Sequence, residues 1–293
     1  MNTARPQHEA NLREQIAASL MHLYPLKSGC GTIVNSKLFA TLAGTRNVDL
    51  WAQVEGGVAL VPSLDLVGRS MFFAGDLDPK VSWVVDRYVN AGDVALDIGA
   101  NLGLVTLRLA KRVGPSGSVH AFEPNPAILR YLEATLQRNS TAPVTLHRTA
   151  LGATASALSL IVPKANAGAA SFISVGGREV DRHIEVLVAR LDDFIDESKI
   201  SHVDFIKMDV EGFEAEVLKG AGNTLSKIRP RVILLEENSG IDGPELPEAL
   251  KILLDQGYSL FGLPKRLTSV EMLPLDRVRN TGAHDFVALL DKI

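Results

Sequence analysis

The chain has 293 residues, of which 46% are hydrophobic and 22% charged, and its formal net charge is −4. This composition is typical of a folded globular protein with a sizeable core and argues against a disordered chain. The slight excess of acidic residues gives no support for nucleic-acid binding through bulk positive charge. A single cysteine, Cys30, excludes an internal disulfide and a thiolate zinc cluster, which favours a reducing compartment. No apolar run approaches the roughly 20 residues that span a bilayer. We therefore expect a cytoplasmic protein with no nucleic-acid or membrane partner.

Residues 1–68 are predicted to form a small N-terminal region. Apolar side chains recur every three or four residues between residues 8 and 24, which predicts an amphipathic helix. Three apolar runs between residues 48 and 73 are separated by turn residues, which predicts a β-meander. The helix could cap the main domain or form a contact between the subunits of a homo-oligomer, and the sequence does not choose between them.

Residues 69–293 show an alternation of strands and helices that predicts one α/β domain. After a helix that begins near Pro79, the predicted strands are VALDIG, SVHAFE, VTLHRTA, VDFIKMDV, RVILLEE, YSLFGL and DFVALL. The predicted helices between them cover residues 102–111, 126–138, 212–225 and 247–256. Two extra strands, ALSLIVP and HIEVLVA, flank a Gly/Ala-rich loop, and such loops often lie over active sites. An open sheet of this kind binds ligands beyond the carboxyl ends of its strands.

The first strand ends in the segment VALDIGANLG, which is a candidate ligand-binding turn. Gly99 and Gly103 would let the backbone approach a ligand closely, and the helix that follows presents unpaired N–H groups. The dinucleotide fingerprint G-x-G-x-x-G is missing, which makes a nicotinamide dehydrogenase a poor alternative. Asp97 would repel a pyrophosphate but could accept hydrogen bonds from an ammonium group. Asn101 could cap the helix as well as meet the ligand. The turn therefore favours a ligand with an amino acid tail.

The second strand ends at Glu123 in the segment VHAFEPNP. A carboxylate at this position can accept hydrogen bonds from both hydroxyls of a ribose, although many strand-end carboxylates are helix caps or solvated charges. A ligand with an amino acid end and a nucleoside end is S-adenosylmethionine. We therefore expect Asp97 and Glu123 to address its two ends.

Together with VARLDDFI, VDFIKMDVEGFEAEVLKGA and RPRVILLEEN, these two segments resemble the FkbM family of S-adenosylmethionine-dependent methyltransferases. The resemblance implies a Rossmann-like class I methyltransferase fold, with a seven-stranded, mostly parallel sheet flanked by helices and one reversed strand at its end. It also implies methyl transfer to oxygen, commonly on sugar or natural-product hydroxyls. The implied cofactor-binding residues are Asp97, Gly99, Asn101 and Gly103 on the methionine side, Glu123 at the ribose, and Asn125, Ala150 and Asp209. Family members often carry glycine and then glutamate-proline upstream, where this chain reads GDLDP with Asp78 in the glutamate's place.

Three residues are candidates for catalysis. Asp209 ends the fourth strand, so its carboxylate should face the reacting atoms, where it could be a base, a substrate anchor or part of the cofactor pocket. Glu236 ends the next strand and could bind substrate hydroxyls. His284 precedes the final strand and is a second candidate base if that strand is reversed.

Magnesium is a further alternative at the same edge of the sheet. Asp209, together with Glu236, Glu237 and Asn238 one strand over, could supply the oxygen ligands that Mg²⁺ prefers. We favour the interpretation in which one glutamate binds substrate hydroxyls and no metal is held. Glu211 is interpreted as a charge near a helix start, and we assign no role to Lys207.

The predicted acceptor is a sugar or another small molecule. Two alternatives remain open: methyl transfer from the same cofactor to nitrogen or to a protein or peptide, and a non-catalytic interaction protein that uses the N-terminal helix as its contact surface. We expect the loops at residues 164–177 and 238–246 to contribute to the specificity for the acceptor, and composition does not determine their shapes.

Overall fold

The computed structural model describes residues 8–26, 28–139, 143–163, 167–173, 180–243 and 245–290. Its centre is an eight-stranded sheet in the order β12-β11-β13-β10-β9-β3-β4-β5. The strands are β3 (Val94–Ile98), β4 (Ser118–Phe122), β5 (Val144–His147), β9 (Phe205–Met208), β10 (Val232–Glu236), β11 (Tyr258–Gly262), β12 (Leu273–Pro274) and β13 (Asp285–Leu290). β13 runs antiparallel to both β10 and β11, whereas β5, β4, β3, β9 and β10 are parallel to one another. The predicted Rossmann-like class I methyltransferase fold with a reversed strand is confirmed, and the two-residue β12 is added at one edge.

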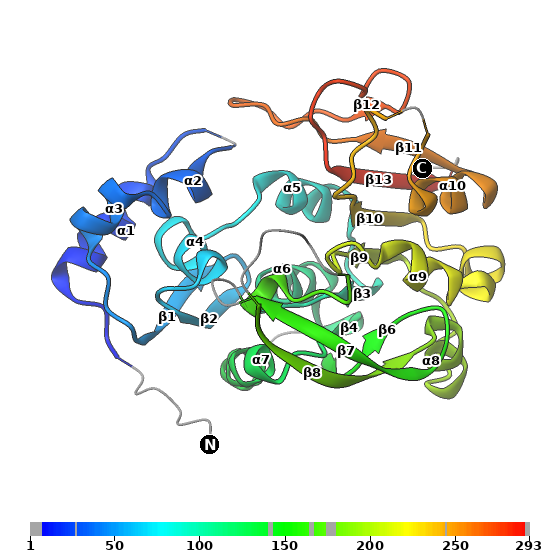
Figure 1. Ribbon diagram of the computed structural model, residues 1–293, viewed down its shortest axis with the longest axis horizontal. Coiled ribbons are helices and arrows are strands. Elements are labelled where there is room, and N and C mark those ends of the chain that lie inside the picture. Colours follow the sequence, from blue (N-terminus) through cyan, green and yellow to red (C-terminus); the bar gives the residue numbers. More distant parts are fainter. Residues whose placement is uncertain are drawn as a thin grey trace.

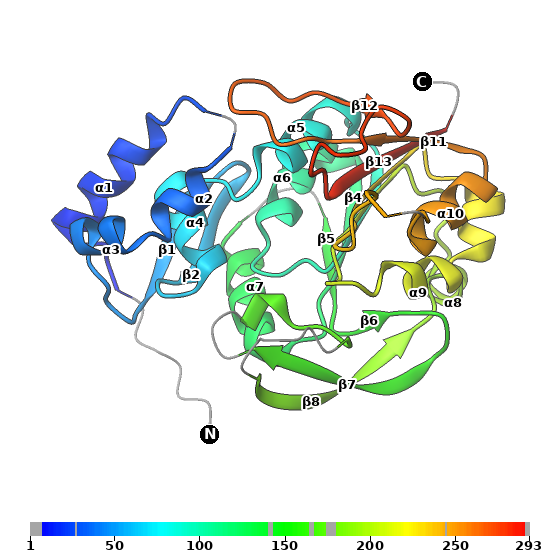
Figure 2. The same cartoon turned by 45° about the horizontal axis from the view of Figure 1, so that its top comes forward.

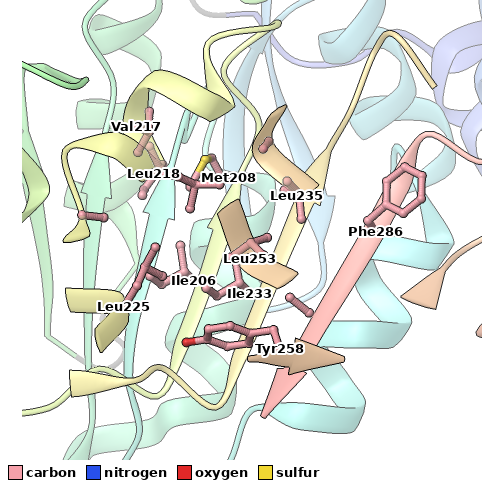
Figure 3. Close-up of a cluster of buried hydrophobic side chains, with 14 of the residues drawn as sticks. Ile206, Met208, Val217, Leu218, Leu225, Ile233, Leu235, Leu253, Tyr258 and Phe286 are labelled. Carbon is pink, nitrogen blue, oxygen red and sulfur yellow. The ribbon is translucent and has the colours of Figure 1, made fainter. Parts of the chain in front are cut away.

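Helices cover both faces of this sheet because the strands bury apolar side chains on both sides. One face packs against α5 (Pro79–Tyr88), α6 (Leu104–Val113) and α7 (Pro126–Arg138). The other packs against α8 (Leu191–Glu197), α9 (Glu214–Lys219) and α10 (Glu248–Asp255). Figure 3 shows the second core, in which Ile206 and Met208 of β9 meet Val217 and Leu218 of α9. The alternate residues of β9, among them Lys207, therefore face α5 and α6.

The N-terminal region lies at the opposite end of the molecule from β11–β13 (Figure 1). It comprises α1 (Leu12–His22), α2 (Cys30–Val34), α3 (Lys37–Ala43), the antiparallel hairpin β1 (Asp49–Val54) and β2 (Gly57–Pro62), and α4 (Leu66–Ala74). The predicted meander is wrong in its third strand, because the segment RSMFFAG lies in α4. Asp65 caps α4 by accepting hydrogen bonds from two backbone N–H groups, and Gly75 ends it with a positive φ. The predicted boundary after residue 68 falls inside this helix.

The two predicted extra strands form a small separate sheet. β7 (Ser156–Pro163) and β8 (Val180–Ala189) pair in antiparallel register, and β6 (Ala150–Leu151) joins β8. Figure 2 shows this sheet below the central one. The segment LDDF begins α8. No helix among the described residues has both the length and the apolar character needed to cross a bilayer.

Candidate functional site

Two adjoining cavities open at the carboxyl ends of the central parallel strands. The larger has a volume of about 380 Å³ and the smaller about 260 Å³. The residues that line both are Val67, Leu77, Gly99, Asn101, Asp209 and Glu236. The turns after β3, β9 and β10 therefore lie where the two cavities meet, which is the place that the strand order predicts for a ligand.

The two glycines after β3 serve the packing of the protein as well as the site. Gly99 has a φ of 80°, and a Cβ added to it would lie 1.9 Å from the backbone oxygen of Asp209. Gly103 has a φ of 89°, begins α6 as its N-cap, and faces Leu132. Gly99 lines both cavities, whereas Gly103 lines neither. Only Gly99 is therefore placed to meet a ligand. Because it has no side chain, the turn after β3 can also pack closely against the backbone at the end of β9.

Asp97 is sealed inside the protein and lines neither cavity. It pairs in register with Lys207 of β9, so both side chains point toward α6. Its carboxylate accepts a hydrogen bond from Thr106 Oγ1 at 2.6 Å and lies 3.4 Å from Lys207 Nζ. Burial alone would lower the pKa of Lys207, but Asp97 and Asp209 raise it and keep the ammonium charged. We expected Asp97 to bind the ammonium group of the ligand. In the structure it pairs with the ammonium group of Lys207.

Lys207 also fixes the turn that follows β3. Its Nζ donates a hydrogen bond to the backbone oxygen of Gly99 at 2.7 Å and lies 3.9 Å from a carboxylate oxygen of Asp209. The sequence did contain a signal for this role, because a lysine within a predicted buried strand needs an anionic partner and Asp97 ends another such strand. The sequence alone does not give the register that brings the two together.

Glu123 lines the larger cavity at the end of β4. Its two carboxylate oxygens accept hydrogen bonds from the backbone N–H groups of Asn101 at 2.9 Å and Asn125 at 2.8 Å. Burial raises its pKa to about 7. These two bonds fix the carboxylate in one orientation, and its remaining lone pairs can accept hydrogen bonds from ligand hydroxyls.

The other three candidate cofactor residues take different places. Asn101 lines both cavities and donates from Nδ2 to the backbone oxygen of Gly168. It does not cap α6, because the N-cap is Gly103. Asn125 is buried and caps α7 by accepting a hydrogen bond from Ala127, outside both cavities. Ala150 lines the larger cavity beside Leu151.

Asp209 and Glu236 are the two acidic side chains shared by both cavities. The Asp209 side chain is 39% exposed. Burial, and then the negative charge of Asp209, raise the pKa of Glu236 to about 9. Burial therefore favours the protonated form of Glu236, which can donate a hydrogen bond. The partly exposed Asp209 carboxylate is placed to accept a proton.

The remaining candidates at the mouth of the sheet lie off the cavities. His284 lines neither cavity, and its Nδ1 lies 3.3 Å from the backbone oxygen of Glu237. Glu237 accepts hydrogen bonds from the N–H and hydroxyl of Ser239, and Asn238 is exposed. No group of three or more His, Cys, Asp or Glu side chains among the described residues is arranged to hold a metal.

Two parts of the cavity wall were missed from the sequence. Glu211, interpreted as a helix-start charge, lies in a turn before α9 with a φ of 54° and lines the larger cavity. Ser171 donates a hydrogen bond to its backbone oxygen, which ties the described part of the Gly/Ala-rich loop, residues 167–173, to the turn. Residues 164–166 and 174–177 of that loop lie outside the described residues, and loop 238–246 contributes no described residue to either cavity. The other part of the wall that the sequence did not predict comes from α2 and α4. No local sequence motif indicates that these helices pack against the cavity.

Comparisons with known proteins agree on one family. The model of the methyltransferase FkbM domain matches residues 97–260, more than half of the chain. The hexuronic acid methyltransferase AglP of Haloferax volcanii is 25% identical over 68% of this chain and 78% of its own length. The 31-O-demethyl-FK506 methyltransferase FkbM of Streptomyces tacrolimicus is 29% identical over 58% of this chain and 74% of its own. Methyltransferase 1 of Beauveria bassiana is 29% identical over 43% of this chain, and the chain spans only 57% of that relative's length.

The matches among solved structures are more distant. The precorrin-6y C5,15-methyltransferase from Geobacter metallireducens has a TM-score of 0.41 and 15% identity, over 73% of this chain and 90% of that one. An O-methyltransferase from Thermotoga maritima has a TM-score of 0.38 and 18% identity, over 73% of this chain and 66% of that one.

Proposed function

Because the chain belongs to the FkbM methyltransferase domain family, we propose that it transfers a methyl group from S-adenosylmethionine to a hydroxyl oxygen of a sugar or small natural product. The observation that best supports S-adenosylmethionine as the cofactor is the position of Glu123. Its carboxylate is oriented by two backbone N–H groups at the wall of the larger cavity, where it can accept hydrogen bonds from both ribose hydroxyls. The names of the curated relatives support an oxygen acceptor, since one acts on a demethyl-FK506 and another on a hexuronic acid.

The charges of the smaller cavity suit the amino acid end of the cofactor. It is lined by the acidic side chains of Asp76, Asp78 and Asp285, and by Arg108 on α6. Asp78 and Asp285 are paired with Lys80, and Arg108 is paired with Asp86, so the ammonium and carboxylate groups of the cofactor would join existing ion pairs here. The N-terminus of α6 also favours a carboxylate. We assign the amino acid end of the cofactor to this cavity in place of Asp97, which lines neither cavity.

The junction of the two cavities is then the place of reaction. When bound, the cofactor supplies the methyl group: the new oxygen–carbon bond forms as the carbon–sulfur bond breaks, and the sulfur keeps the electron pair. We assign Asp209 as the residue that accepts the hydroxyl proton, because its carboxylate lines both cavities and is partly exposed. Protonated Glu236 can donate a hydrogen bond to the acceptor, which helps to orient it. His284 takes no part in this proposal.

Calorimetric titration with S-adenosylmethionine and S-adenosylhomocysteine tests the cofactor site. We expect binding by the wild type and a loss of about 1.5 to 3 kcal/mol in Glu123→Ala, because a charge-assisted acceptor is removed. Glu185→Gln is the matched control, since Glu185 is an exposed glutamate of β8 outside both cavities. A wild type that binds neither compound would remove the methyltransferase proposal and leave the interaction protein as the better account.

A further inference from the structure

One wall of the larger cavity is built by the N-terminal region. Gly31 of α2 and its C-cap residue Asn35 line it, as do Leu66, Val67 and Ser70 of α4. Leu77, just before α5, continues the same wall. All of these residues precede residue 97, where the match to the family model begins. The wall is therefore a feature of this chain that the family match does not describe.

The wall adjoins the place of reaction. Val67 and Leu77 line both cavities, as do Asp209 and Glu236. The proposed nucleoside site uses Glu123, which directly follows β4, and Ala150 of β6. The α4 side of the cavity is thus available to the second substrate, next to the carboxylate that would take its proton.

The wall exposes apolar surface. The side chains of Leu66 and Leu77 are 45% and 41% exposed although both border the cavity. Covering such surface with a ligand is favourable in proportion to the apolar area removed from water. An acceptor with an apolar face would gain free energy here, whereas a wholly hydrated one would not.

The ionisable residues that line the larger cavity are all acidic: Glu123, Asp209, Glu211 and Glu236. No Lys, Arg or His of the described chain lines it. Burial raises the pKa of Glu123 and of Glu236, so the negative charge that an acceptor meets comes mainly from Asp209 and Glu211.

The two cations of the smaller cavity already have partners. Arg108 donates a hydrogen bond to Asp86 at 2.6 Å, and Lys207 is held by Asp97 and Gly99. A carboxylate on the acceptor would meet like charges without an unengaged cation among these lining residues. Like charges repel more strongly in a partly buried site than in water, so such an approach is unfavourable.

We infer that the acceptor is an uncharged alcohol with an apolar face, which packs against Leu66, Val67 and Leu77 and presents its hydroxyl to Asp209. This inference rests on the proposed function and narrows its substrate class. It sets the chain apart from the Haloferax relative, whose name states that it acts on a hexuronic acid.

A pair of matched acceptors tests the charge. p-Nitrophenyl β-glucopyranoside and p-nitrophenyl β-glucuronide differ at one carbon, which bears an alcohol in the first and a carboxylate in the second. In assays of radiolabelled methyl transfer that also include the galactoside, mannoside and fucoside, we expect the neutral glycosides to be methylated. We expect the glucuronide to have a kcat/KM at least about tenfold below that of the best of them.

A pair of matched leucines tests the wall. Leu66→Ser and Leu77→Ser should each raise the KM for the best neutral acceptor about fivefold, because part of a leucine side chain no longer covers it. Leu64→Ser should leave that KM unchanged, since Leu64 is 43% exposed but lines neither cavity. The dissociation constant for S-adenosylmethionine should stay within twofold in Leu64→Ser and Leu66→Ser, since neither residue lines the smaller cavity.

The outcomes separate this inference from the proposed function. A glucuronide that reacts as well as the neutral glycosides would overturn the inference, as would an equal rise of KM in Leu64→Ser and Leu66→Ser. If S-adenosylmethionine binds but no neutral glycoside is methylated, the acceptor class is wrong and the cofactor site stands. If S-adenosylmethionine does not bind, the proposed function fails and the inference fails with it.

Discussion

The N-terminal region, residues 8–74, and the sheet domain, residues 79–290, handle apolar and charged side chains differently. The N-terminal region exposes nine large hydrophobic side chains among its described residues, whereas the described part of the much longer sheet domain exposes five. Both regions bury charged side chains, but Glu14, Asp49 and Arg69 of the N-terminal region line neither of the two cavities. In the sheet domain, Lys207 and Asp285 are buried and line the smaller cavity. The N-terminal region therefore has an exposed apolar outer face, whereas the sheet domain places buried charge at its cavities.

The Asp97–Lys207 pair gives the largest expected effect. Lys207→Met would leave the fully buried Asp97 carboxylate without its cation, and breaking a buried ion pair from one side costs about 3 to 5 kcal/mol. Chemical denaturation of the variant should show this loss in the free energy of unfolding.

A double variant separates the lost charge pairing from lost packing. Asp97→Asn combined with Lys207→Met removes both charges, so it should be less destabilised than Lys207→Met alone. Equal destabilisation of the single and double variants would mean that the pair is not what stabilises this end of the sheet.

Glu123 gives an intermediate effect that depends on pH. Burial raises its pKa to about 7, and the carboxylate is the form that accepts two ribose hydroxyls. Its ionised fraction increases as pH rises through 7, so the dissociation constant for S-adenosylmethionine should fall about tenfold between pH 6 and pH 8. Calorimetric titrations at both values measure this directly.

Glu214 is the matched control for that experiment. It is also buried with its pKa raised to about 7 by burial, but it holds the turn before α9 and lines neither cavity. Glu214→Gln should keep the pH dependence of binding, and Glu123→Gln should lose it. A wild-type affinity that does not change with pH would contradict the assignment of Glu123 to the ribose.

The difference between the two regions also explains what the sequence could predict. The helix over residues 126–138 and the carboxylates at the strand ends follow from local signals, and the structure has α7 at those bounds. The partner of Asp97 lies 110 residues away and depends on strand register, which no local signal contains. The apolar run RSMFFAG fits a strand or a buried helix equally well. The helix cap that Asp65 provides at the start of α4 favours the helix.

The outer face of the N-terminal region gives the smallest expected effect. Leu20 on α1 is 65% exposed, so Leu20→Ala removes few contacts and should change the free energy of unfolding by less than about 0.5 kcal/mol. Leu50 on β1 belongs to the same region but is fully buried, and Leu50→Ala should cost about 2 to 5 kcal/mol. Denaturation of both variants measures how far the two faces differ. A loss in Leu20→Ala as large as that in Leu50→Ala would show that the outer face is covered in solution, and the contrast between the two regions would then disappear.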